Sequence, residues 1–145
     1  MPLIDIVALD PELTLPAYAR VGDGAVDLLA RADGVVAPCG GRLVVGSGIA
    51  IALPQGWCAL VLSRSGLAAR NGVFVANAPG LVDAGFRGEI MIPLVNTDPS
   101  EPFVVTRGDR VAQLLVLQLD AIRWNVVDQL DDTERGAGGF GHTGR

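Results

Sequence analysis

The sequence predicts an all-β protein with a single domain, built as a barrel or jelly-roll-like sandwich with one short helix. Apolar residues recur with a period of two in several short segments, which is typical of strands that bury one face. Turn-forming residues separate these segments at short intervals, as in sandwiches and barrels. The chain has 145 residues, enough for one core that buries about 70% of the unfolded surface.

The clearest alternation runs through residues 49–53, 90–94 and 115–119. Its apolar members are Ile49, Ile51 and Leu53, then Ile90, Ile92 and Leu94, and then Leu115, Leu117 and Leu119. We expect each set to line one face of a strand and to point into the core. Glycine and proline turns lie between the strands, at residues 38–41, 54–56, 71–72, 79–80, 98–99 and 107–109.

One short helix is expected from about Ser65 to Arg70. Ser65 is a residue type that caps helix N-termini, and the Asn71-Gly72 pair is typical of a helix C-terminus. The preceding Ser63-Arg64 step places a cation at this helix start, where free backbone N–H groups can bind an anion. Simple helix capping is the alternative interpretation.

We divide the chain into a β domain, residues 1–130, and a flexible tail, residues 131–145. The tail is polar and then glycine-rich, with too little apolar content to order itself in a core. It nevertheless carries Arg135 and Phe140, a cation and an aromatic ring. Such a segment can close as a lid over an anionic ligand, with the cation binding the anion and the aromatic ring stacking on a ring of the ligand. A disordered terminus is the alternative.

Composition excludes several functions. A net charge of −5 argues against a broad nucleic-acid-binding face. Apolar stretches stop well short of the ~20 residues that span a bilayer, so we expect no membrane segment. The N-terminus lacks the features of a signal peptide, and Cys39 and Cys58 suit free thiols, so we expect a cytoplasmic protein.

Two further segments carry polar groups that suit a ligand. The Ala84-Gly85 pair can form a tight hairpin turn with Asp83 and Phe86 on facing strands. Backbone donors beside an aromatic ring would suit a nucleobase, although a purely structural hairpin is the alternative. Gln113 lies between apolar neighbours on a strand, and a buried amide needs partners, which a ligand can supply.

The order of these segments along the chain resembles the five motifs of the trimeric dUTPase family. The matching segments are residues 23–28, 64–66, 77–89, 107–113 and 135–144. The match therefore extends from Asp23 almost to the end of the chain. Each segment is weakly specific alone, but five in this order are highly specific.

The resemblance implies a homotrimer with active sites shared between subunits. It implies hydrolysis of dUTP to dUMP and pyrophosphate, which keeps uracil out of DNA and supplies dUMP for dTMP synthesis. In the family, the aspartate that matches Asp83 acts as general base on a water that attacks the α-phosphorus. Mg²⁺ is held chiefly by phosphates and waters, and Asp27 matches the residue that holds such waters.

The remaining site residues follow from the same resemblance. Phosphates would contact Arg64, Ser65, Gly66 and Gln113; the nucleoside would contact Asn77, Gly80, Val82, Phe86 and Arg87; the tail would add Arg135, Phe140, Gly141, His142 and Thr143.

Some positions depart from the family pattern. Ala25 stands where glycine is usual, and a positive φ there would cost about 1 kcal/mol. Phe86 replaces a tyrosine and His142 a serine, whereas Ser63 and Ala78 are minor changes. Two alternatives stay open: a dCTP deaminase of the same fold, for which Glu89 is the candidate water-activating residue, and a nucleotide-binding trimer that has lost catalysis.

Overall fold

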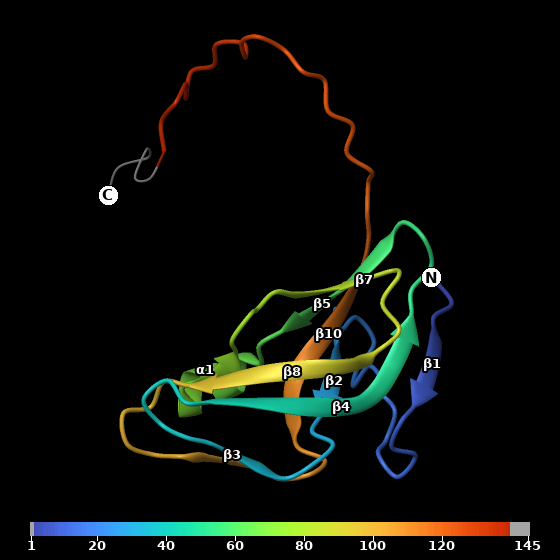
Figure 1. Ribbon diagram of the computed structural model, residues 1–145, viewed down its shortest axis with the longest axis vertical. Helices are drawn as coiled ribbons and strands as arrows, with labels where there is room; N and C mark the ends of the chain where they lie inside the picture. Colours follow the sequence, from blue (N-terminus) through green and yellow to red (C-terminus); the bar gives the residue numbers. More distant parts are fainter. Residues whose placement is uncertain (1, 140–145) are drawn as a thin grey trace.

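The computed structural model describes residues 2–139 (Figure 1). Its strands are β1 (Asp5–Ala8), β2 (Val26–Leu29), β3 (Gly34–Val36), β4 (Arg42–Ala52), β5 (Trp57–Leu62), β6 (Val73–Val75), β7 (Gly80–Asp83), β8 (Glu89–Asn96), β9 (Phe103–Val105) and β10 (Arg110–Gln118). The described part of the chain has one helix, α1 (Ser65–Asn71). The predicted all-β fold with one short helix is confirmed.

The strands form two four-stranded sheets, in the orders β1-β4-β8-β6 and β2-β10-β5-β7, and a two-stranded ribbon, β3-β9. Every pairing is antiparallel. A single buried cluster takes side chains from both larger sheets: Leu28, Ala59, Val61, Val82, Ala112 and Leu114 from one, and Val45, Ile49, Ile51, Val73, Val75, Ile90, Ile92 and Leu94 from the other. One apolar core therefore joins the two sheets.

The prediction that alternate apolar residues point into the core is confirmed for residues 49–53 and 90–94, but it is wrong for residues 115–119. Ile49, Ile51 and Leu53 are buried, and so are Ile90, Ile92 and Leu94. In β10 the buried side chains are Val111, Ala112 and Leu114, whereas Leu117 is 38% exposed. Both faces of β10 are apolar, so alternation cannot show which face turns inward.

The end of α1 agrees with the prediction, but its start does not. Gly72 adopts a left-handed φ of 63°, and its N–H donates to the Ala68 carbonyl, which terminates the helix. At the other end the N-cap residue is Arg64, and no side chain caps the helix. Ser65 is already the first helical residue, so its predicted capping role is wrong.

The Ala84-Gly85 turn is confirmed, because the Phe86 N–H donates to the Asp83 carbonyl at 3.0 Å. The predicted facing strands are wrong. β7 pairs with β5, whereas β8 pairs with β4 and β6, so the chain crosses from one sheet to the other after the turn. Asp83 ends β7, and Phe86 lies in the crossing segment outside any strand.

The chain leaves the sheets after β10 and runs away from the body (Figure 1). The described part of this segment exposes Ile122, Trp124 and Val126. The division into domains at residue 130 remains a prediction. Within residues 2–139, no helix has both the length and the apolarity needed to cross a bilayer.

One buried amide connects three parts of the fold. Asn96, at the end of β8, is fully buried. Its Nδ2 donates to the carbonyls of Val36 and Glu101, and its Oδ1 accepts the N–H of Asp98. This side chain therefore links β8 to β3 and to the loop before β9.

We predict that Asn96→Ala lowers the free energy of unfolding by about 2–4 kcal/mol, because it leaves buried backbone groups unpaired and opens a cavity. Denaturant unfolding at equal protein concentration measures the loss. Ser100→Ala, in the exposed part of the same loop, is the control and should change stability by less than about 0.5 kcal/mol. Equal effects of the two substitutions would contradict this role of Asn96.

Candidate active site

Three predicted site segments meet on the outer face of the sheet β2-β10-β5-β7. Asp27 on β2 lies opposite Gln113 on β10, and Gln113 lies opposite Leu62 on β5. Directly opposed residues of antiparallel strands point to the same face, so these side chains form one row across the sheet. Arg64 follows two residues after Leu62, where β5 has ended and α1 begins.

This row forms one wall of a cavity of about 580 Å³. The cavity is lined by Ala17, Ala19, Arg20, Asp23, Gly24, Ala25, Asp27, Leu62, Arg64, Gln113 and Leu115. Residues from the first, second and fourth predicted segments therefore share one cavity. The structure adds the segment before β2, including Arg20, which the sequence had not singled out.

A carboxylate and two guanidinium groups organise the charge at this cavity. Asp27 Oδ1 accepts from Arg64 Nε at 3.2 Å, and Asp27 Oδ2 lies 3.6 Å from Arg110 Nη1. Arg64 Nη1 also donates to the Arg110 carbonyl at 2.8 Å. The side chains of Asp27 and Arg64 are 22% and 30% exposed, so these contacts orient both groups before any ligand binds.

The reversed glycine and alanine of the first segment cause no backbone strain. Among described residues other than glycine, a positive φ occurs at Cys39, and Ala25 is not affected. The expected cost at Ala25 is therefore absent.

The third segment lies at a second cavity, of about 150 Å³. Its lining includes Asn77, Gly80, Val82, Asp83 and Phe86, together with Val61, Leu81, Ile90 and Met91. It has no lining residue in common with the cavity at Asp27. Within one chain Asp83 lies opposite Cys58, four residues along β5 from Leu62, which lies opposite Gln113.

Close contacts with glycine shape this second cavity. A Cβ at Gly80 would lie 3.1 Å from Asn77 Nδ2, so the amide rests against bare backbone. A Cβ at Gly88 would lie 2.7 Å from Phe86 Cζ, so any side chain there would displace the ring. Arg87 Nη1 donates to the carbonyls of Ala84 and Phe86, which ties the turn together.

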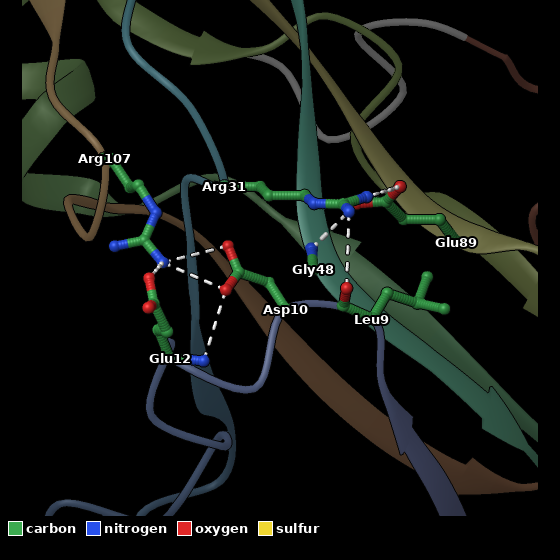
Figure 2. A network of polar contacts seen from close by, with 7 residues as sticks. All are labelled: Leu9, Asp10, Glu12, Arg31, Gly48, Glu89 and Arg107. Carbon is green, nitrogen blue, oxygen red and sulfur yellow. Dashed lines mark hydrogen bonds and ion pairs between the residues drawn. The ribbon is translucent and has the colours of Figure 1, made fainter.

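The fourth segment begins with a turn held from both sides. Asp109 Oδ2 accepts the N–H of Thr106 at 2.8 Å, which closes the turn. Arg107 Nη2 donates to Asp10 at 2.9 Å and to Glu12 at 3.4 Å (Figure 2). Asp10 and Glu12 therefore connect the N-terminal segment to the turn that leads to Arg110 and Gln113.

Glu89, at the start of β8, is engaged by partners other than the Asp83 segment. Its carboxylate accepts from Arg31 Nη1 at 3.0 Å and from the Gly48 N–H at 2.8 Å (Figure 2). A Cβ at Gly46 would collide with Glu89 Oε1, so the carboxylate lies directly over this glycine. Glu89 does not line the Asp83 cavity.

Not every predicted site residue joins these cavities. Ser65 is exposed, and Gly66 lies under the Arg70 guanidinium, whose Nη2 would be 2.8 Å from a Cβ added to Gly66. Arg135 lies in the tail, where its Nε donates to the Gly138 carbonyl. Phe140, Gly141, His142 and Thr143 lie outside the described residues.

The described acidic side chains do not form a metal-binding cluster. Within residues 2–139, no three His, Cys, Asp or Glu residues gather closely enough to hold a metal ion. Asp27 presents a partly exposed carboxylate at the cavity wall. This arrangement fits a hydrated ion that takes most of its ligands from elsewhere.

A model of the dUTPase family matches residues 12–144. The chain belongs to the dUTPase family. The deoxyuridine 5'-triphosphate nucleotidohydrolase of Thermobifida fusca is 55% identical over 97% of this chain and 78% of its own length. The enzyme of the same name from Corynebacterium glutamicum is 54% identical over 98% and 95%.

Solved dUTPase structures share the fold. The dUTPase of Staphylococcus bacteriophage 80alpha with dUPNHPP has a TM-score of 0.89 and 21% identity, over 100% of both chains. The dUTPase of phage phi11 of S. aureus, which coordinates a structural Mg(II) ion, has a TM-score of 0.81 and 18% identity, over 90% of this chain and 100% of its own.

We predict a coupling of about 1 kcal/mol between Asp27 and Arg64 in unfolding free energy, because the pair is only partly exposed. A double-mutant cycle with Asp27→Ala and Arg64→Ala measures it. The cycle for Glu12 and Arg107 is the control: Glu12 is 84% exposed, so its coupling should be close to zero. A larger value for the control than for the cavity pair would contradict this assignment.

Proposed function

We propose that this chain hydrolyses dUTP to dUMP and pyrophosphate with Mg²⁺, as a homotrimer whose active sites lie between subunits. The observation that carries the proposal is that Asp83 and Gln113 line different cavities and face positions four residues apart on β5, Cys58 and Leu62. Attack on a phosphate requires the base and the phosphate-binding groups around one substrate. Juxtaposing the cavities of two subunits would meet this requirement.

Apolar exposure supports association of the subunits. Leu81 on β7 is 61% exposed, and Phe86, Met91 and Leu117 are also exposed. Such residues near a cavity are typical of surfaces that another subunit covers. The described tail adds the exposed side chains of Ile122, Trp124 and Val126.

In the proposed reaction Asp83 is the general base. Its carboxylate is exposed at the end of β7, where it can orient a water molecule toward the α-phosphorus. The turn that follows is held by the Phe86 to Asp83 hydrogen bond and by Arg87. Pyrophosphate is the leaving group.

The phosphate chain would lie along the cavity with Arg64 and Gln113. Arg64 donates from Nε to Asp27 and from Nη1 to the Arg110 carbonyl. Its Nη2 would then donate to a phosphate oxygen. Ser65 and Gly66 follow at the start of α1. Asp27 would hold waters of the Mg²⁺ ion, which supplies positive charge to the phosphates when bound.

The second cavity would take the nucleoside. Asn77 and the backbone of Gly80 and Val82 would bind the uracil, and Phe86 would pack against the deoxyribose. Arg87 would act indirectly, by holding the Ala84-Gly85 turn through its hydrogen bonds to the carbonyls of Ala84 and Phe86. Arg135, Phe140, Gly141, His142 and Thr143 would close over the substrate as a lid. The cytoplasmic location remains a prediction.

The deaminase alternative gains no support, because Glu89 is paired with Arg31 and does not line the Asp83 cavity. The deciding experiment measures pyrophosphate release from dUTP, dCTP, dTTP and UTP, with and without Mg²⁺. Pyrophosphate release that occurs with dUTP but not with the other three nucleotides, and that requires Mg²⁺, would support the proposal. Ammonia release from dCTP, or binding of dUTP without turnover, would overturn it.

We predict that Asp83→Asn lowers kcat by about 10²- to 10⁴-fold, because the amide cannot accept a proton from water. Steady-state pyrophosphate release with dUTP measures the loss. Asp5→Asn, an exposed change on β1, is the matched control and should leave kcat unaltered. An Asp83→Asn variant as active as the control would remove the proposed base.

We also predict that mixing two inactive variants restores activity. Asp83→Asn removes the general base of a shared site, and Arg64→Gln removes one of its phosphate-binding residues. If each site draws these residues from different subunits, trimers refolded from an equal mixture should have about a quarter of their sites intact. A mixture as inactive as its components would show that both residues act within one chain.

A further inference from the structure

The segment before β2 brings an additional cation to the larger cavity. Arg20 lines it together with Arg64 and Gln113. Its backbone is fixed from both sides: the Arg20 N–H donates to Asp23 Oδ2 at 2.8 Å, and the Asp23 N–H donates to the Arg20 carbonyl at 3.3 Å. Asp23 thus holds Arg20 at the cavity wall.

The three arginines near this cavity differ in their partners. Arg64 and Arg110 are both paired with Asp27, whose single negative charge offsets one of their two positive charges. Within residues 2–139, no hydrogen bond or ion pair involves the Arg20 guanidinium, and the residue is exposed. The Asp23 carboxylate is turned to the Arg20 backbone instead. Arg20 therefore has its full donor capacity available to a ligand.

We propose that Arg20 is a substrate-binding residue that contacts the phosphates beyond the α-phosphorus. This inference rests on the proposed function, in which the nucleoside and α-phosphorus lie beside Asp83. The wall that carries Arg20 is shared with Arg64 and Gln113, not with Asp83. A guanidinium binds terminal phosphate oxygens through charge-assisted, often bidentate, hydrogen bonds.

Binding of an inert substrate analogue tests this contact directly. Calorimetry with α,β-imido-dUTP should show that Arg20→Gln weakens binding by about 3- to 10-fold, since an exposed charged contact is partly screened by solvent. Binding of dUMP, which lacks the outer phosphates, should stay within about twofold. With dUTP, KM should rise while kcat changes little, as expected when ground state and transition state lose the same contact.

Three further variants make the test specific. Arg20→Lys should retain most of the affinity, because it keeps the charge. Arg20→Met, which keeps a long apolar side chain, should lose as much analogue affinity as Arg20→Gln. It can replace Arg20→Gln in the test if the glutamine variant folds poorly. Arg42→Gln, an exposed residue at the start of β4 outside both cavities, is the matched control and should bind as the unmodified protein does.

Asp23 is a positioning residue in this scheme. Asp23→Ala alone should weaken analogue binding, and in the Arg20→Gln background it should add nothing, because both changes remove the same contact. Full additivity would overturn the positioning role.

Unchanged analogue affinity in Arg20→Gln, or an equal loss for dUMP, would overturn the inference about Arg20. These outcomes differ from failure of the proposed function, in which the unmodified protein itself would not turn over dUTP.

Discussion

The register between β2, β10 and β5 is the constraint on which the rest of the candidate site depends. It aligns Asp27, Gln113 and Leu62 in one row on the outer face, while Leu28, Ala112 and Leu114 enter the core. Because side chains alternate, a shift of one residue would bury the carboxylate and expose the leucines. The apolar core therefore enforces the position of the polar row.

Local ion pairs then determine how a chain with a net charge of −5 can accept an anionic ligand. Asp27 holds Arg64 and Arg110, and Asp10 with Glu12 holds Arg107 (Figure 2). Each carboxylate restricts the rotamers of an arginine in advance, which lowers the entropy lost when a ligand binds. Arg20 differs because its backbone, and not its guanidinium, is held by an acid.

The two cavities give the proposed trimer a physical basis. The Asp83 cavity offers a carboxylate beside an aromatic ring, and the Asp27 cavity offers guanidinium groups and an amide, with no residue in common. Neither set is sufficient for phosphate hydrolysis by itself, since catalysis needs base and charge stabilisation at one phosphorus. Association of subunits would thus complete the chemistry as well as cover apolar surface.

The sequence by itself determined the all-β class, the end of α1 at Gly72 and the turns, because alternation and glycine conformations are local properties. It also indicated the motif residues through their order along the chain. Tertiary structure decided the inward face of β10, since both of its faces are apolar, and the separation of β7 from β8. It alone brought Asp10 to Arg107, 97 residues away, and placed Arg20 in one cavity with Arg64. Such contacts depend on how the sheets pack, which local sequence patterns do not encode.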